Sequence, residues 1–79
     1  MENIYKTNDF YITSCLIASG IKLITLEKNS DRFLTFVLDI NPINAQSLIS
    51  DYWNRNLILP CKDVIEAINQ LKTRLHGSK

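Results

Sequence analysis

The 79 residues predict an α+β fold, a single small domain in which a β-hairpin packs with three helices in the order α-β-β-α-α. Three observations predict it. An apolar stretch of helical length precedes Gly20, two runs rich in β-branched and aromatic residues flank a turn sequence, and Pro42 and Pro60 each open a segment with helical periodicity. No repeat or linker divides the sequence, so we expect one domain over residues 1–79, with flexible ends at 1–4 and 77–79.

The N-terminal part predicts a helix that runs through about Ser19. Thr7 or Asn8 is a suitable N-cap, and Asp9 in the first turn interacts favourably with the helix dipole. Gly20 is a typical helix stop. The helix carries little polar surface, so we expect other elements to contact it from more than one side.

Residues 21–39 predict a β-hairpin, because IKLITLEK and RFLTFVLD are strand-like runs on either side of NSD. With a loop at 29–31, Ile24 lies opposite Phe36 on one face of the hairpin. Leu26 then lies opposite Leu34 on the same face. A slip of one residue would exchange the faces of one strand. The other face would carry a mixed set of side chains: Leu23, Thr25, Phe33, Thr35 and Val37.

Two further helices follow the hairpin. Asn41 caps the first, Pro42 stands in its first turn, and apolar residues at helical spacing continue it to about Asn56. Pro60 opens the second, which ends at Gly77. The apolar stripe of this last helix is Val64, Ile65, Ile68, Leu71 and Leu75, and its outer face is Lys62, Asp63, Glu66, Asn69, Gln70, Thr73 and Arg74.

The charge balance argues against a strongly basic nucleic-acid binder. Nine Lys and Arg face eight Asp and Glu, and the two signs are interspersed. The N-terminus has Glu2 in place of the basic segment of a targeting peptide, and no apolar run approaches the roughly 18 residues of a membrane span. We therefore expect a cytoplasmic protein that does not enter a membrane.

Few side chains offer reactive chemistry. Cys15, Cys61 and His76 are the only residues of their types, and their spacing provides no pair of zinc ligands. Both cysteines are expected to be buried free thiols, and His76 is expected to favour the last turn of its helix. The acids have ordinary structural roles and no glycine-rich phosphate motif is present, so we expect no enzyme activity, cofactor or metal.

The side chains suited to binding are concentrated in two places. Aromatic residues beside an arginine, as in DYWNR, are enriched at protein interfaces, although Tyr52 and Trp53 are alternatively expected to complete the core. The apolar first helix and the mixed hairpin face exceed the cover that one chain supplies, which predicts a homodimer or another protein partner. The residues expected in this interaction are Leu23, Phe33, Val37, Tyr52, Trp53 and Arg55. The alternative is a nucleic-acid-binding accessory protein that contacts phosphates through Lys62, Lys72, Arg74 and Lys79.

The stretch YKTNDFYITSCLIASGIKLI resembles the opening of the family known as domain of unknown function 5659. Farther along, FLTFVLD, DYWN and a final proline before a helix closing in LKTRL are similar in outline. The sequence departs from the family at residues 10–15, where Leu and Ala are usual. The resemblance implies a bacterial or phage setting and a compact accessory protein, and it carries over no activity or catalytic residue. The matching positions are Tyr5, Thr7, Asp9, Leu16, Gly20 and Leu23.

Overall fold

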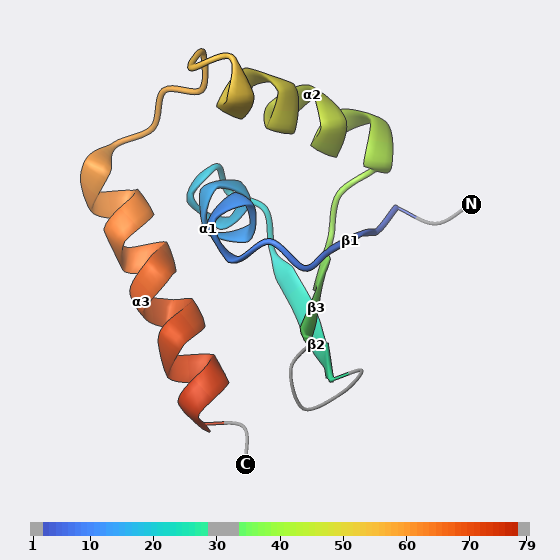
Figure 1. The fold of residues 1–79 in the computed structure, drawn as a ribbon, viewed down its shortest axis with the longest axis vertical. Coiled ribbons are helices and arrows are strands. Elements are labelled where there is room, and N and C mark those ends of the chain that lie inside the picture. Colours follow the sequence, from blue (N-terminus) through green and yellow to red (C-terminus); the bar gives the residue numbers. More distant parts are fainter. Residues whose placement is uncertain (1–2, 29–33, 78–79) are drawn as a thin grey trace.

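The computed structural model describes residues 3–28 and 34–77, and within them a three-stranded antiparallel sheet packs with three helices (Figure 1). This confirms the α+β class and the order of the hairpin and helices. A short strand ahead of the first helix was not predicted, because three residues are too few to show an alternating pattern. The elements are β1 (Tyr5–Thr7), α1 (Phe10–Ala18), β2 (Leu23–Lys28), β3 (Leu34–Leu38), α2 (Pro42–Trp53) and α3 (Cys61–Gly77).

The hairpin strand β3 lies in the middle of the sheet, between β1 and β2. Leu26 pairs with Phe36 and Lys28 pairs with Leu34, so the register predicted from a loop at 29–31 is wrong by two residues. The pairing leaves the whole of 29–33 between the strands, two residues more than the predicted loop. Residues 29–33 lie outside the described part of the chain. Ile24 sits at an irregularity between Leu23 and Thr25 and has no partner in the described register, in place of its predicted pairing with Phe36.

The two faces of the sheet follow from this pairing. Tyr5, Leu38 and Leu23 stand in one row on the inner face, which is continuous with the core. The other face carries Val37 and Thr25, as predicted, together with Lys6 of β1. Leu23 was also predicted on that face, and this is wrong. The irregularity between Leu23 and Thr25 shifts the pairing with β3 by one residue, so Leu23 and Thr25 lie on opposite faces of the sheet.

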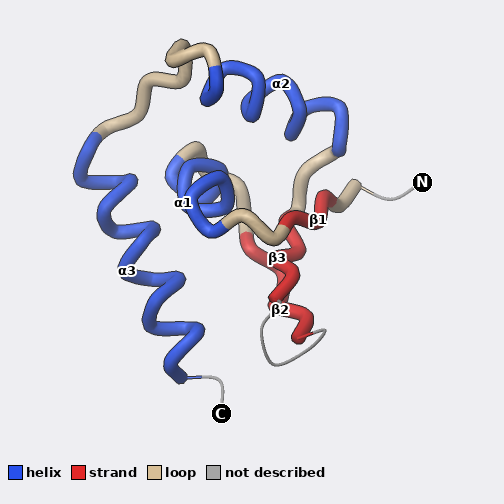
Figure 2. The backbone as a smooth tube through the Cα atoms, in the orientation of Figure 1, coloured by secondary structure: helices blue, strands red, loops and turns tan. Residues whose placement is uncertain are grey.

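Helix α1 lies at the centre of the fold, with the sheet, α2 and α3 arranged around it (Figures 1 and 2). Ile12 and Leu16 are buried in a cluster with Leu38 and residues of the segment that leads into α2. The prediction that this helix is contacted from more than one side is confirmed. These core residues were expected to lack enough covering surface within one chain. That expectation is wrong for them, because β1, α2 and α3 cover them.

Buried hydroxyls on α1 are satisfied within the helix itself. Thr13 Oγ1 donates to the carbonyl oxygen of Asp9 at 2.8 Å, and Ser14 Oγ donates to that of Phe10 at 3.0 Å. Both residues are almost completely buried. Because each hydroxyl has a partner one turn back, small polar residues fit here without an unpaired polar group.

The ends of α1 differ from the prediction at one residue. Asp9, and neither Thr7 nor Asn8, is the N-cap, since its Oδ1 accepts a hydrogen bond from the backbone N–H of Ile12 at 2.9 Å. Thr7 Oγ1 instead accepts from the N–H of Asp9 at 3.2 Å. Gly20 follows the helix with a φ of +100°, which confirms its predicted role as the stop.

Helices α2 and α3 begin close to the predicted prolines. Asn41 caps α2 by accepting from the N–H of Ile43 at 2.8 Å, as predicted, but α2 ends at Trp53 and not at Asn56. In α3, Leu71 is fully buried against α1, whereas Ile65 is 57% exposed. Ile65 stands about 100° around the helix from Val64, outside the buried stripe. That stripe is Val64, Ala67, Ile68, Leu71 and Leu75.

Candidate interaction surfaces

The end of α2 carries the aromatic pair that the sequence singles out. Tyr52 is half-buried and packs against the core cluster, whereas Trp53 is 67% exposed. The two rings meet edge to face, with centroids 5.1 Å apart and planes at 79°. Tyr52 therefore completes the core, as the alternative interpretation expected, and Trp53 does not.

A tight turn follows Trp53 and sets the direction of the chain into α3. Arg55 has a φ of +63°, a left-handed conformation that favours glycine. The N–H of Asn56 donates to the carbonyl of Asp51 at 2.8 Å, and the N–H of Arg55 donates to that of Tyr52 at 3.2 Å. This bonding closes the helix end. Ile58, just after the turn, is 89% exposed, so large apolar side chains flank the turn on both sides.

The other predicted contact residues lie elsewhere. Val37 is only 4% exposed, between Lys6 of β1 and Thr25 of β2. Leu23 is half-buried and packs on the core. Phe33 lies outside the described residues. The structure therefore does not join these hairpin residues to Tyr52, Trp53 and Arg55 in one exposed surface.

The basic residues of α3 do not converge. Lys72 and Arg74 are two positions apart on the helix, which places them about 160° apart around its axis. Lys62 lies near the start of α3, 4.0 Å from Glu66. Lys79 lies outside the described residues. Among the positions that the structure describes, these cations do not form a common face for a phosphate backbone.

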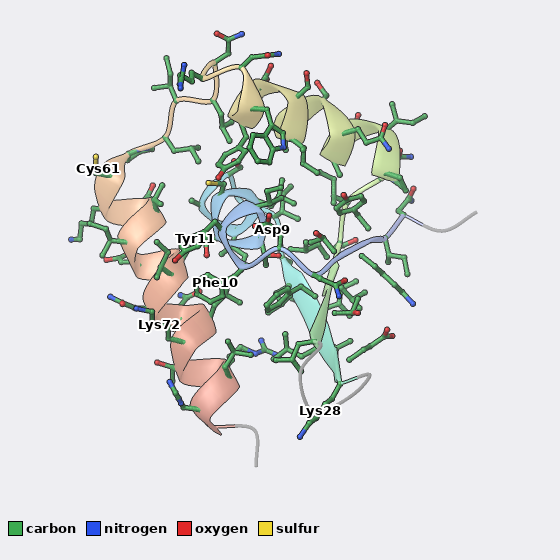
Figure 3. All side chains as sticks on the ribbon, viewed as in Figure 1. Asp9, Phe10, Tyr11, Lys28, Cys61 and Lys72 are labelled. Atoms are coloured by element: carbon green, nitrogen blue, oxygen red, sulfur yellow. The ribbon has the colours of Figure 1, made fainter. Side chains whose placement is uncertain are left out.

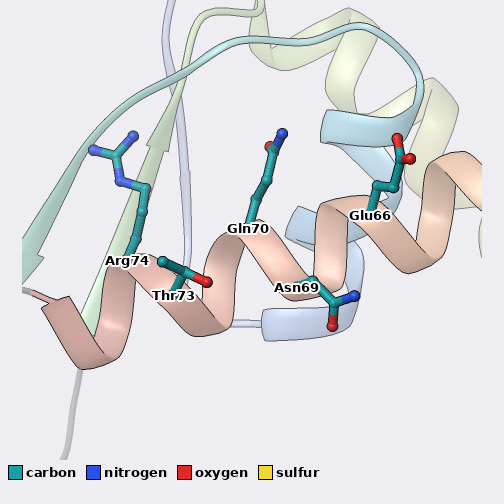
Figure 4. Close-up of a pocket in the computed structure, with 5 residues that line it drawn as sticks. All are labelled: Glu66, Asn69, Gln70, Thr73 and Arg74. Carbon is teal, nitrogen blue, oxygen red and sulfur yellow. The ribbon is translucent and has the colours of Figure 1, made fainter.

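A groove runs along the polar side of α3, beside the segment that joins α1 to β2. Figure 4 shows Glu66, Gln70 and Arg74 projecting from one side of the helix, whereas Asn69 projects from another. Asn69 and Thr73 also line the largest depression. Adjoining depressions of about 550, 350 and 190 Å³ share Gln70 as a lining residue. We call this feature the α3 groove. In the two smaller depressions, the opposite wall is Ile17, Ala18, Gly20, Ile21, Lys22 and Leu23. The described residues that line the largest depression all belong to α3.

The two cysteines have different environments. Both are free thiols, as predicted, but only Cys15 is partly buried, and Cys61 is exposed at the start of α3 (Figure 3). The prediction of burial is wrong for Cys61, which is the first residue of α3 and precedes the buried stripe that begins at Val64. Burial raises the pKa of the Cys15 thiol, and the nearby Asp9 carboxylate raises it further.

Over residues 3–28 and 34–77, no group of three His, Cys, Asp or Glu side chains is placed to hold a metal ion. Over the same ranges, no helix combines the length and apolar character needed to cross a bilayer.

A family model described as Domain of unknown function (DUF5659) matches residues 2–77. The chain belongs to this family. The match covers every described element of the DUF5659 fold, from β1 to the end of α3. No curated protein and no solved structure matches the chain.

Sequence reasoning missed three features of this DUF5659 chain: the exposure of Ile65, the exposure of Tyr11 and the α3 groove. The exposure of Ile65 was hidden because it fits a helical apolar pattern, and that of Tyr11 because its helix is apolar nearly all round. Figure 3 shows Tyr11 on the side of α1 that faces α3. The groove was missed because the outer face of α3 resembles an ordinary solvated face. A signal was present in the spacing of Glu66, Gln70 and Arg74, which recur every fourth residue and so share one side of the helix.

Proposed function

We propose that this DUF5659 chain is a small non-catalytic protein-interaction module of bacterial or phage origin that self-associates through the end of α2. The observation that carries the proposal is the exposure of Trp53, together with that of Ile58, which is even more exposed and lies on the other side of the turn. Tryptophan presents a large apolar area with a single N–H donor, and it is among the residues that dominate binding energies at interfaces.

The hydrogen-bonded turn between the two side chains supports this proposal. Scattered single apolar residues are normal on protein surfaces, so the exposure of Trp53 alone is weak evidence. Here Trp53 and Ile58 lie on either side of a hydrogen-bonded turn, and Arg55 within it is exposed. The edge-to-face contact with Tyr52 ties the indole to the core. A preorganised aromatic group loses little conformational entropy on binding.

The test is the oligomeric state over a range of concentrations, measured by light scattering coupled to size exclusion. Wild-type protein is expected to form a dimer that dissociates on dilution. Trp53→Ala is expected to weaken self-association by about thirtyfold, equivalent to about 2 kcal/mol. Its thermal unfolding should change little, because a side chain exposed to this extent contributes little to the core.

Ile43→Ala is the matched control, since Ile43 is 78% exposed at the opposite end of the same helix. It should leave self-association unchanged. A strict monomer at all concentrations would overturn the proposal, as would a Trp53→Ala variant that unfolds easily while associating normally. A dimer that Ile43→Ala weakens as much as Trp53→Ala does would place the interface elsewhere.

A further inference from the structure

We propose that the α3 groove binds an extended peptide segment of a partner protein, apolar at its centre and oppositely charged at its two ends. Its acidic residue would lie toward Lys22 and its basic residue toward Asp63 and Glu66. This proposal goes beyond self-association through Trp53, because no residue near that turn lines the groove.

The dimensions of the groove suit a short extended segment. From Asp63 to Arg74 the helix rises by roughly 16 Å, at about 1.5 Å per residue. An extended peptide rises by about 3.3 Å per residue, so about five residues span this length. The depression between α3 and β2 has a volume of about 350 Å³, within the range that protein pockets use for ligands.

The walls of the groove combine an apolar floor with a polar rim. Ile17, Ile21 and Leu71 line the depression next to β2, and Leu71 is fully buried beneath it. Gln70 lines every part of the groove. Its amide offers both a donor and an acceptor, which is the pairing that a peptide backbone requires. A peptide that places an apolar side chain on the floor and its main chain along Gln70 therefore matches both the apolar floor and the polar rim.

The neighbouring strand provides a second source of backbone hydrogen bonds. In the described sheet β2 pairs with β3 alone, so its other edge is open. Leu23 is both the first residue of β2 and part of the groove wall. A strand added along this edge would therefore begin beside the groove, at Leu23.

The charges select the occupant. Asp63 and Glu66 stand at one end of the groove, and Lys22 and Arg74 stand at the other. A nucleic-acid strand carries negative charge along its whole length and is repelled by the acidic end. A peptide with one acid and one base fits both ends. The contact between Glu66 and Lys62 is long, at 4.0 Å, and exposed, so it competes only weakly with a ligand.

The experiment measures fluorescence anisotropy of the full chain with three labelled hexapeptides that share the central sequence Val-Leu-Val-Thr. One carries Lys and Asp at its ends, one carries two Asp, and one carries two Lys, and their termini are blocked so that side chains supply all charge. The peptide with both signs should bind at least about fivefold more tightly than the other two at low salt. Glu66→Lys leaves Asp63 opposed by a lysine, so it should reduce the advantage of the peptide with both signs over the peptide with two Asp.

Lys72→Glu is the matched control, because Lys72 is an exposed cation of the same helix that does not line the groove. It should leave all three affinities unchanged, and so should Trp53→Ala, which separates this proposal from the previous one. Circular dichroism verifies that each variant is folded. The proposal is overturned if no peptide binds saturably up to about 1 mM, or if Glu66→Lys leaves the ratio of the affinities for the mixed peptide and the peptide with two Asp unchanged.

Discussion

Lys6 Nζ lies 3.5 Å from Glu27 Oε2, and the two side chains meet across the central strand of the sheet. Lys6 on β1 is opposite Val37, and Glu27 on β2 is opposite Thr35. Because β3 lies between these edge strands, the pair crosses its outer face. Val37 and Thr35 are buried there. The methylene stem of Lys6 shields apolar surface while its charged end stays in water.

This arrangement predicts that the stem of Lys6 matters more than its charge. Both partners are about half exposed, so the ion pair itself is worth at most about 0.5 kcal/mol. Lys6→Ala should lower the free energy of unfolding by about 1 kcal/mol, because Val37 loses its cover. Lys6→Met, which keeps a long apolar chain, should lose less than half of that. Urea unfolding measures both, and equal losses would show that the charge dominates.

The N-cap of α1 is expected to be worth about 1 kcal/mol. Asp9→Ala removes the side-chain oxygen that accepts the hydrogen bond from the Ile12 N–H at the start of α1. The midpoint temperature of thermal unfolding of this variant should therefore fall clearly. Asp9→Asn keeps an oxygen in the same place and should retain most of the stability. If Asp9→Asn is as unstable as Asp9→Ala, the negative charge and not the hydrogen bond is responsible.

The raised pKa of Cys15 predicts a loss of stability in alkaline solution. Burial, and next the Asp9 carboxylate, raises this pKa in the folded state, so the folded chain keeps the thiol proton longer than the unfolded chain. The contribution is fully present below the unfolded pKa of about 8.5 and is lost as pH rises through the folded value. Cys15→Ala should flatten this part of the stability curve relative to wild type.

Urea unfolding from about pH 7 to about pH 10 under reducing conditions measures the difference between the two proteins. Cys61→Ala is the control, since Cys61 is exposed. It should show the same alkaline decline as wild type. An identical pH dependence for wild type and Cys15→Ala would contradict the prediction.

The sequence predicted the elements that have strong local signals. The helix stop at Gly20, the cap at Asn41 and the opening of α3 after Pro60 depend on backbone geometry that few residue types supply, and all three are confirmed. The register of the hairpin depends on how many residues the turn takes up, and this is not encoded in a periodic pattern. The prediction therefore placed Leu26 opposite Leu34 when it pairs with Phe36.

The surfaces were less predictable, since exposure is decided by tertiary packing. Tyr52 and Trp53 are adjacent aromatic residues, yet only the first reaches the core. Val37 is buried because β1 adds to the sheet, and a strand of three residues leaves no pattern in the sequence. The α3 groove is formed by residues from α1, β2 and α3 together, so the sequence of any one segment does not predict it.

The left-handed conformation of Arg55 predicts that glycine at this position stabilises the protein. With a φ of +63°, the Cβ of Arg55 is held close to neighbouring backbone atoms, at a cost of roughly 1–2 kcal/mol. Glycine removes that cost but gives the unfolded chain more freedom, which offsets part of the gain. Arg55→Gly should therefore raise the free energy of unfolding by up to about 1 kcal/mol. Asn54→Gly is the control, because Asn54 has a φ of −87° and carries no such strain, and it should be neutral or destabilising.

The same Arg55→Gly protein, studied by light scattering, shows whether the arginine side chain strengthens association beside Trp53. A variant that is more stable but associates less would show that Arg55 supports binding at the expense of stability, whereas a loss of stability would contradict the strain argument.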